Sequence, residues 1–350
     1  DYNGGYVFPC ALSFGTYLVL RKNDKALARF ATTNFDHRGE VKLDEPFEKE
    51  GKSWFNYPVG VLNELRKKAK EIEGVDLLYS GDIPNGAGLS SSASIEMVTA
   101  FAMNEIFDFG KDLMELVKIS QSAENNFVGV NCGIMDQFAS GMGARDHALF
   151  LNCDTLDYER VPLKLDGMKI VIANTNKRRG LADSKYNERR AQCESAVEAI
   201  RKERKIKHLS DLNLDEFNAL SHLISDETQK RRARHVITEN TRTLGAIEAL
   251  NKGDITSFGQ LMNQSHDSLR DDYEVTGKEL DTLVEEARKV EGTIGSRMTG
   301  AGFGGCTVSI VEEDQVETFI REVGLRYKER TGLSADFYVA EIGDGSKQIF

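Results

Sequence analysis

The stretch GDIPNGAGLSSSASIEMV, residues 81–98, joins flexible glycines and three consecutive serines to an apolar run, and it decides the fold. The preceding VDLLYS (75–80) is typical of a short buried strand. The following SASIEMVTAFAMNEIFDF (92–109) is apolar nearly all round, as buried helices are. A strand, a glycine-bearing loop and a helix start together predict an anion site. The reason is that about four backbone N–H groups stay unpaired at a helix N-terminus, where the helix dipole favours negative charge.

The residues of this loop suit a phosphate. Gly86 and Gly88 let a phosphate approach without a Cβ in the way, and Ser90, Ser91 and Ser92 supply hydroxyls for phosphate, for a metal ion or for a helix cap. The alternative is a serine-capped helix after a loose turn. One cap needs only one serine, so phosphate binding is the favoured interpretation. The loop is not a Walker A motif, because the lysine of that motif is absent.

A second glycine cluster is MTGAGFGGC, residues 298–306, in which Gly300, Gly302 and Gly305 satisfy G-x-G-x-x-G. A dinucleotide site would continue into a helix within a βαβ unit, whereas strand-like CTVSIV follows here, so the NAD interpretation is rejected. Two interpretations stay open. The cluster is either a tight turn or a place where the backbone closely approaches a substrate or the first loop.

Two carboxylates lie between the glycine clusters. Asp136 has apolar neighbours in GVNCGIMDQFASGMG (129–143), and a poorly solvated Asp is suited to accept a proton from a hydroxyl. Local sequence by itself favours the alternative, a helix N-terminal or salt-bridging Asp. Glu124 is either an exposed helix charge or a Mg²⁺ ligand, since Mg²⁺ prefers hard oxygen donors.

Composition excludes several classes of function. A net charge of -11 argues against nucleic-acid binding, and the basic run 230–235 is read as a solvated helix face rather than a phosphate patch. The five cysteines form no C-x-x-C pair, which indicates reduced thiols and a cytoplasmic location and argues against a zinc site. No apolar stretch reaches the roughly 18–20 residues of a membrane span.

The order of elements predicts α/β or α+β layers. Strands are expected at 147–153, 158–163, 168–175, 305–311 and 335–342. A charge-rich helical region is expected from about 175 to 291, and a further helix at 314–332. Near residues 165–180 the sequence changes from strand-like segments to a charge-rich helical region, which predicts two domains, 1–170 and 171–350.

Three segments in order resemble the three motifs of the GHMP small-molecule kinases and, within that superfamily, the galactokinases. They are DYNGG (1–5), PNGAGLSSSAS (84–94) and GSRMTGAGFGGC (295–306). Agreement continues through CGIMDQFAS (132–140), SKYNERRAQCE (184–194), RRARH (231–235) and SHDSLRDDYEV (265–275), so the resemblance covers nearly the whole chain.

The resemblance implies a two-lobed α+β fold of mixed sheets with helices packed on them, and an active site in the cleft between the lobes. It implies transfer of phosphate from Mg²⁺-ATP to the anomeric C1 hydroxyl of galactose, giving galactose 1-phosphate, the first step of galactose catabolism. The expected partner is the sugar alone, with neither nucleic acid nor membrane, and the expected state is a monomer. The alternatives are an N-acetylgalactosamine kinase and a non-catalytic sensor that binds galactose and ATP.

The resemblance also assigns roles by position. Asp136 would be the catalytic base, and Asp1, Gly133 and Tyr186 would contact the sugar. Trp54 would lie near the nucleotide base. The remaining assignments are the ATP-phosphate loop, made of Gly86, Ala87, Gly88, Leu89, Ser90, Ser91 and Ser92, and the Mg²⁺ ligands Ser92 and Glu124.

One departure concerns the first motif, whose G-R-x-N-L-I-G-E-H part is absent because the chain opens at Asp1. We therefore expect that the true start is missing and that the chain by itself is nearly inactive. A second departure, Ala301 where many relatives have Gly, is expected to be harmless.

Overall fold

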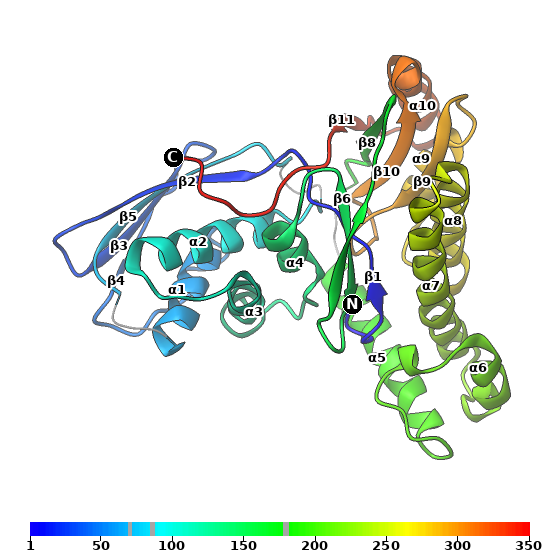
Figure 1. Ribbon diagram of the computed structural model, residues 1–350, viewed down its shortest axis with the longest axis horizontal. Coiled ribbons are helices and arrows are strands. Elements are labelled where there is room, and N and C mark those ends of the chain that lie inside the picture. The colour runs from blue at the N-terminus through cyan, green and yellow to red at the C-terminus, as the bar shows by residue number, and fades with distance from the viewer. Residues whose placement is uncertain (69–71, 85–87, 178–181) are drawn as a thin grey trace. The chain divides into compact units, whose positions relative to one another are not determined.

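The computed structural model describes residues 1–68, 72–84, 88–177 and 182–350 (Figure 1). The predicted loop positions Gly86 and Ala87 lie outside the described residues. The chain forms two compact units. Unit 1 comprises Asp1–Pro9, Gly86–Leu89 and Asp146–Glu341, and unit 2 comprises Cys10–Asn85, Ser90–Arg145 and Ile342–Phe350. These units divide the chain at other places than residue 170, so the domain boundary stays a prediction.

Unit 2 is built on a four-stranded mixed sheet covered by helices. The strand order is β2 (Thr16–Lys22), β5 (Val75–Gly81), β3 (Leu27–Thr32) and β4 (Gly39–Lys42), with β3 parallel to β5 and the other pairs antiparallel. Alternate residues of β5 are buried, as in a sheet with one covered face. The helices are α1 (Asn56–Lys68), α2 (Ser91–Phe107), α3 (Leu113–Ser122), the π-helix η1 (Ala123–Val128) and α4 (Met135–Met142).

The predicted strand, loop and helix order around residue 81 is confirmed. β5 leads into the loop and α2 begins at Ser91. The Tyr79 hydroxyl on β5 lies 2.8 Å from that of Thr99 on α2, which ties the helix to the sheet behind the loop. The loop is therefore held at both ends by buried elements.

Unit 1 holds two antiparallel sheets. One has the order β1 (Tyr6–Val7), β6 (His147–Asn152) and β7 (Tyr158–Pro162), and the other β11 (Asp336–Ala340), β8 (Met168–Asn174), β10 (Cys306–Glu312) and β9 (Thr293–Met298). Its helices are α5 (Ala182–Ile200), α6 (Leu214–Leu220), α7 (Glu227–Asn251), α8 (Ile255–Ser268), α9 (Lys278–Ala287) and α10 (Val316–Thr331). The short 3₁₀-helices η2 (Leu209–Asp211), η3 (Ser221–Leu223) and η5 (Glu313–Gln315) and the π-helix η4 (Leu269–Tyr273) complete it.

A core between β8, α9 and α10 supports the second sheet. Val171 of β8 packs with Leu283 of α9 and Phe319 of α10, all of them buried. The Tyr327 hydroxyl donates to the Thr175 carbonyl at 2.7 Å and so joins α10 to the end of β8. The predicted strands and the helical region after residue 175 are confirmed.

The basic run at 230–235 corrects one prediction. It lies on α7, but Arg232 is buried, with its Nε 3.1 Å from Gln192 Oε1 and its Nη2 paired with Glu274. His235 is buried as well. The expectation of a solvated face is wrong at these two positions. The Arg232 guanidinium finds carboxylate, amide and carbonyl partners, and a ring nitrogen of His235, Nδ1, lies 3.0 Å from the Ser268 hydroxyl. Among the described helices, none has the length and apolar character needed to cross a bilayer.

Candidate active site

The N-terminus of α2 presents its serines to two carboxylates of unit 2. Ser90 is the N-cap residue, but it adopts the left-handed conformation at φ 58° and its side chain makes no capping bond. Its hydroxyl instead hydrogen-bonds Asp136. Ser92, two residues later, hydrogen-bonds Glu124. The interpretation of the serines as a simple helix cap is therefore wrong for Ser90. A non-glycine residue at positive φ is uncommon, and such residues cluster at functional sites.

Asp136 lies in the first turn of α4, as the structural alternative held. The carboxylate is nonetheless poorly solvated, and burial raises its pKa above the ordinary value of 3.8. The hydrogen bond from Ser90 opposes that shift, while the negative charge of Glu124 adds to it. A carboxylate with a raised pKa is a stronger base than an exposed Asp.

Glu124 is buried, so the alternative of an exposed helix charge is wrong. It lies on the π-helix η1, a form that is frequent at functional sites. Gln137 Nε2 donates to its Oε2 at 2.6 Å. Burial raises the pKa of Glu124 in spite of hydrogen bonds from Ser92, Glu96, Cys132 and Gln137.

Sequence reasoning missed Glu96. It is fully buried on α2, where burial and the neighbouring charge of Glu124 hold its pKa well above the ordinary value of 4.5. The side chains of Glu96 and Glu124 are hydrogen-bonded, which requires a proton between two carboxyl groups, and the strongly raised pKa assigns that proton to Glu96. A signal was present in the sequence: Glu96 is a carboxyl group between Ala93 and Ala100 on the buried face of an apolar helix.

The donor set fits a Mg²⁺ ion that carries a nucleotide. Glu124 is a buried carboxylate bonded to the hydroxyl of Ser92, and both groups are hard oxygen donors. Within the described ranges, no group of three or more His, Cys, Asp and Glu side chains could hold a metal by itself. A Mg²⁺ ion here would complete its shell with water and phosphate oxygens, as is usual for this ion.

Gly300 of the third motif lies against Gly88, and both residues belong to unit 1. Gly300 has a φ of +76°, and a Cβ added to it would lie 3.1 Å from the carbonyl oxygen of Gly88. Gly302 has a φ of +83° and lies against the carbonyl of Val275. The interpretation of a close backbone approach to the first loop is confirmed. β10 follows the motif, in keeping with the rejection of an NAD site.

Two of the predicted sugar contacts share a neighbour in unit 1. The Tyr2 backbone N–H donates to Asp1 Oδ1 at 2.8 Å, and the Tyr2 ring meets the Tyr186 ring edge-on at a centroid distance of 5.2 Å. The Tyr2 hydroxyl is hydrogen-bonded to that of Tyr273. Tyr2 therefore brings Asp1 and Tyr186 together, which the sequence pattern did not reveal.

The other two predicted contacts belong to unit 2. Gly133 comes directly before Ile134, the N-cap residue of α4. Trp54 is half-buried, donates from Nε1 to the His37 carbonyl at 2.9 Å and meets the Tyr79 ring edge-on.

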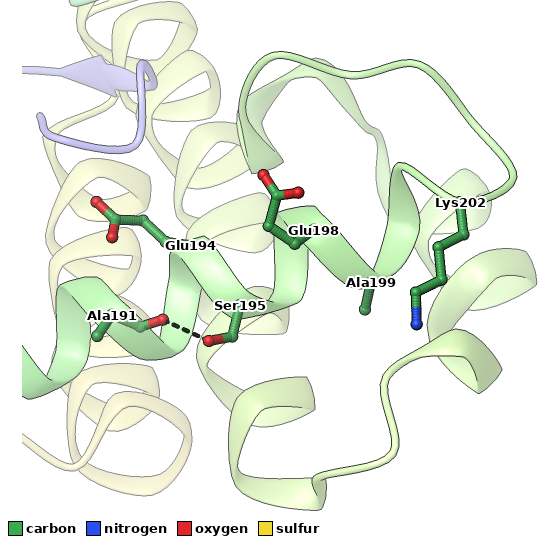
Figure 2. A pocket seen from close by; sticks show the side chains of 6 residues that line it. All are labelled: Ala191, Glu194, Ser195, Glu198, Ala199 and Lys202. Carbon is green, nitrogen blue, oxygen red and sulfur yellow. Dashed lines mark hydrogen bonds between the residues drawn. The ribbon is translucent and has the colours of Figure 1, made fainter.

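A hollow along α5 contains none of the predicted site residues (Figure 2). Its lining residues are Ala191, Glu194, Ser195, Glu198, Ala199 and Lys202. The Ser195 hydroxyl donates to the Ala191 carbonyl at 2.9 Å, so its proton is not held by a general base.

Comparisons with known proteins identify the relatives of this chain. Residues 56–144 match the GHMP kinases N terminal domain and residues 246–329 the GHMP kinases C terminal domain. The chain is 56% identical to a galactokinase of Fusobacterium nucleatum, over 100% of this chain and 91% of the relative. It is 51% identical to a galactokinase of Bacillus subtilis, over 100% of this chain and 90% of the relative.

Solved structures place the fold in the same group. A Lactococcus lactis galactokinase crystallised with galactose superposes with a TM-score of 0.97 at 46% identity, covering 100% of this chain and 91% of that one. The mevalonate kinase of Methanococcus jannaschii superposes with a TM-score of 0.68 at 16% identity, over 97% of this chain and 92% of that one. The second likeness shows the fold alone.

Proposed function

Since this chain belongs to the galactokinase family of GHMP kinases and phosphorylates galactose with ATP, we propose that Asp136 accepts the proton of the sugar's C1 hydroxyl. The observation that carries this role is the poorly solvated Asp136 carboxylate, with its raised pKa, hydrogen-bonded to the first serine of α2. As the proton moves to Asp136, the sugar oxygen attacks the γ-phosphorus of ATP, the bond to the leaving ADP breaks, and galactose 1-phosphate forms.

The loop Gly86–Ser92 holds the ATP phosphates in this proposal. The backbone N–H groups at the start of α2 are free to bind anions, as at other helix N-termini. The close approach of Gly300 to the Gly88 carbonyl oxygen supports the role, because it restricts the backbone at Gly88. Trp54 lies near the nucleotide base, an assignment that rests on the family resemblance.

Ser92 and Glu124 hold Mg²⁺ in this proposal. The hydrogen bond between the two side chains supports the assignment, because it brings a hydroxyl and a carboxylate oxygen together. When bound, Mg²⁺ neutralises charge on the phosphates. In the protein itself, Ser92 orients Glu124, and Ser90 keeps the pKa of Asp136 lower than burial by itself would set it.

Asp1, Gly133 and Tyr186 contact the sugar. The edge-on ring contact of Tyr2 with Tyr186 and its N–H bond to Asp1 support two of the three, because they hold both side chains in defined orientations. Orientation matters, since phosphoryl transfer depends mainly on in-line positioning.

ADP release from Mg²⁺-ATP tests the proposal, using protein that carries the complete first motif, with galactose, N-acetylgalactosamine, glucose and no sugar compared. We expect galactose-dependent ADP, and loss of at least about 100-fold in kcat in Asp136→Asn, because the amide cannot accept the proton. Calorimetry with ADP should show that this variant still binds nucleotide. The control is Asp166→Asn, an exposed carboxylate, which should retain full activity.

The outcomes separate the alternatives. Full activity of Asp136→Asn would refute the catalytic assignment. A preference for N-acetylgalactosamine would change the substrate. Binding of galactose and ATP without ADP formation would identify a sensor.

A further inference from the structure

A buried amide links two carboxyl groups at the core of unit 2. Gln137 Nε2 donates to Glu124 Oε2 at 2.6 Å and to Glu96 Oε2 at 3.1 Å. Gln137 and Glu96 are fully buried, and Glu124 is 6% exposed. The amide orientation follows from chemistry, because the ionised Glu124 carboxylate only accepts hydrogen bonds, so the Gln137 group that lies 2.6 Å from it is the NH₂ group.

Holding the Gln137 amide between the two carboxyl groups destabilises the fold, because two buried oxygens are left without partners in the described part of the chain. Gln137 Oε1 and Glu96 Oε1 are buried without a hydrogen-bond partner among the described residues. A buried polar atom without a hydrogen-bond partner destabilises the folded protein. An apolar side chain at position 137 would leave no orphaned amide oxygen, but it would also remove the N–H donors that hold the two carboxyl groups.

The helix α4 couples this amide to the proposed base. Asp136 and Gln137 are consecutive, and successive helical residues point about 100° apart. One residue can therefore bond Ser90 while the next bonds Glu124. The backbone of the first turn of α4 then fixes the spacing between the base and the Glu124 carboxylate.

We propose that Gln137 is a positioning residue that locks the orientation of the Glu124 carboxylate toward Mg²⁺, with Glu96 as the second anchor of the amide. This role rests on the proposed assignment of Glu124 as a Mg²⁺ ligand. The hydrogen bond from Gln137 to one oxygen of Glu124, 2.6 Å long, restricts rotation of the carboxylate. Binding of the metal then costs less side-chain entropy. Outer-shell partners of metal ligands typically change metal affinity or activity by about 10- to 100-fold.

The test measures how strongly Mg²⁺ promotes nucleotide binding. ADP is titrated into the purified protein by calorimetry, with Mg²⁺ and then with EDTA, and the ratio of the two dissociation constants is the Mg²⁺ coupling. In Gln137→Met, which keeps the length of the side chain and removes both donors, we expect this coupling to fall about 10-fold or more. The Mg²⁺ concentration for half-maximal rate should rise by a similar factor. The KM for galactose should stay close to that of the control.

The matched control is Asn104→Leu. Asn104 is another buried amide of unit 2, at the opposite end of α2, where its Oδ1 accepts from the Lys111 backbone N–H at 2.9 Å. The variant should lower the stability to urea and leave the Mg²⁺ coupling at the wild-type value. Gln137→Asn is the second test variant. It stays polar, but its shorter side chain withdraws the amide from Glu124, so its coupling should also fall.

Glu124→Gln separates failure of this inference from failure of the proposed function. Loss of coupling in both Glu124→Gln and the Gln137 variants supports the proposal. Loss in Glu124→Gln with wild-type coupling in either Gln137 variant overturns it and leaves the metal assignment standing. Wild-type coupling in Glu124→Gln overturns the metal assignment, and the role of Gln137 with it.

Discussion

Replacing Gly300 by Ala tests whether the third motif acts by supporting the phosphate loop. Gly300 has a φ of +76°, and the new Cβ would lie 3.1 Å from the Gly88 carbonyl oxygen, so the loop backbone must move by a few tenths of an ångström. The left-handed conformation by itself costs an alanine about 1–2 kcal/mol. Gly332, which ends α10, has a φ of +78° and nothing within 4 Å of the added Cβ. Gly332→Ala is therefore a control for the backbone cost without the contact.

Both variants should lose a similar free energy of unfolding, about 1–2 kcal/mol, measured by urea denaturation. Only Gly300→Ala should also lose kcat/KM for ATP. Because a displacement of about 1 Å at a reacting group can cost about 100-fold, a few tenths of an ångström in the loop should cost roughly 3- to 10-fold. A kcat/KM for ATP in Gly300→Ala no lower than in Gly332→Ala would refute the reasoning, since the contact with Gly88 would then have no effect on the nucleotide.

Two further predictions concern pH. Ser90→Ala removes the hydrogen bond that lowers the pKa of Asp136, so this pKa should rise. The acid limb of the kcat/KM profile for galactose should then move to higher pH. An unchanged acid limb would show that Ser90 does not control the pKa of Asp136. Burial lowers the pKa of His235 from 6.5 to about 4, so as the pH falls through that window the unfolded chain takes up a proton that the folded protein does not. Between about pH 7 and about pH 5 the free energy of unfolding should therefore fall by about 2 kcal/mol more in the wild type than in His235→Phe, and parallel urea-stability curves would contradict this.

Much of the fold follows from local pattern. Residues 168–175 and 305–311 were expected to form strands and residues 314–332 an amphipathic helix, and they form β8, β10 and α10. The pairing of these strands did not follow from any local pattern, since β10 lies between β8 and β9 and contacts residues far away in sequence. The π-helix at Ala123–Val128 was also missed, because an extra residue in a helical turn leaves no mark in the apolar spacing.

The residues of the candidate site could be named from the sequence, whereas the hydrogen bonds between them could not. The residues Ser90, Ser92, Glu124 and Asp136 were named from motifs, and the structure brings them together in two hydrogen-bonded pairs. The burial of these side chains could not be predicted from the sequence, because the burial of Glu124 depends on how η1 packs. The local sequence also gave no reason for Gln137 to point at two carboxyl groups. Such contacts are set by tertiary packing, which overrides local preference.

The contact between Gly88 and Gly300 joins two segments that are synthesised at different times. Protein synthesis proceeds from the N-terminus, and the residues that flank the loop, β5 and α2, leave the ribosome long before the third motif does. The loop backbone lacks its supporting glycine until residue 300 has emerged. A nascent chain therefore holds the serines of the phosphate loop well before it holds the glycine that packs against the loop.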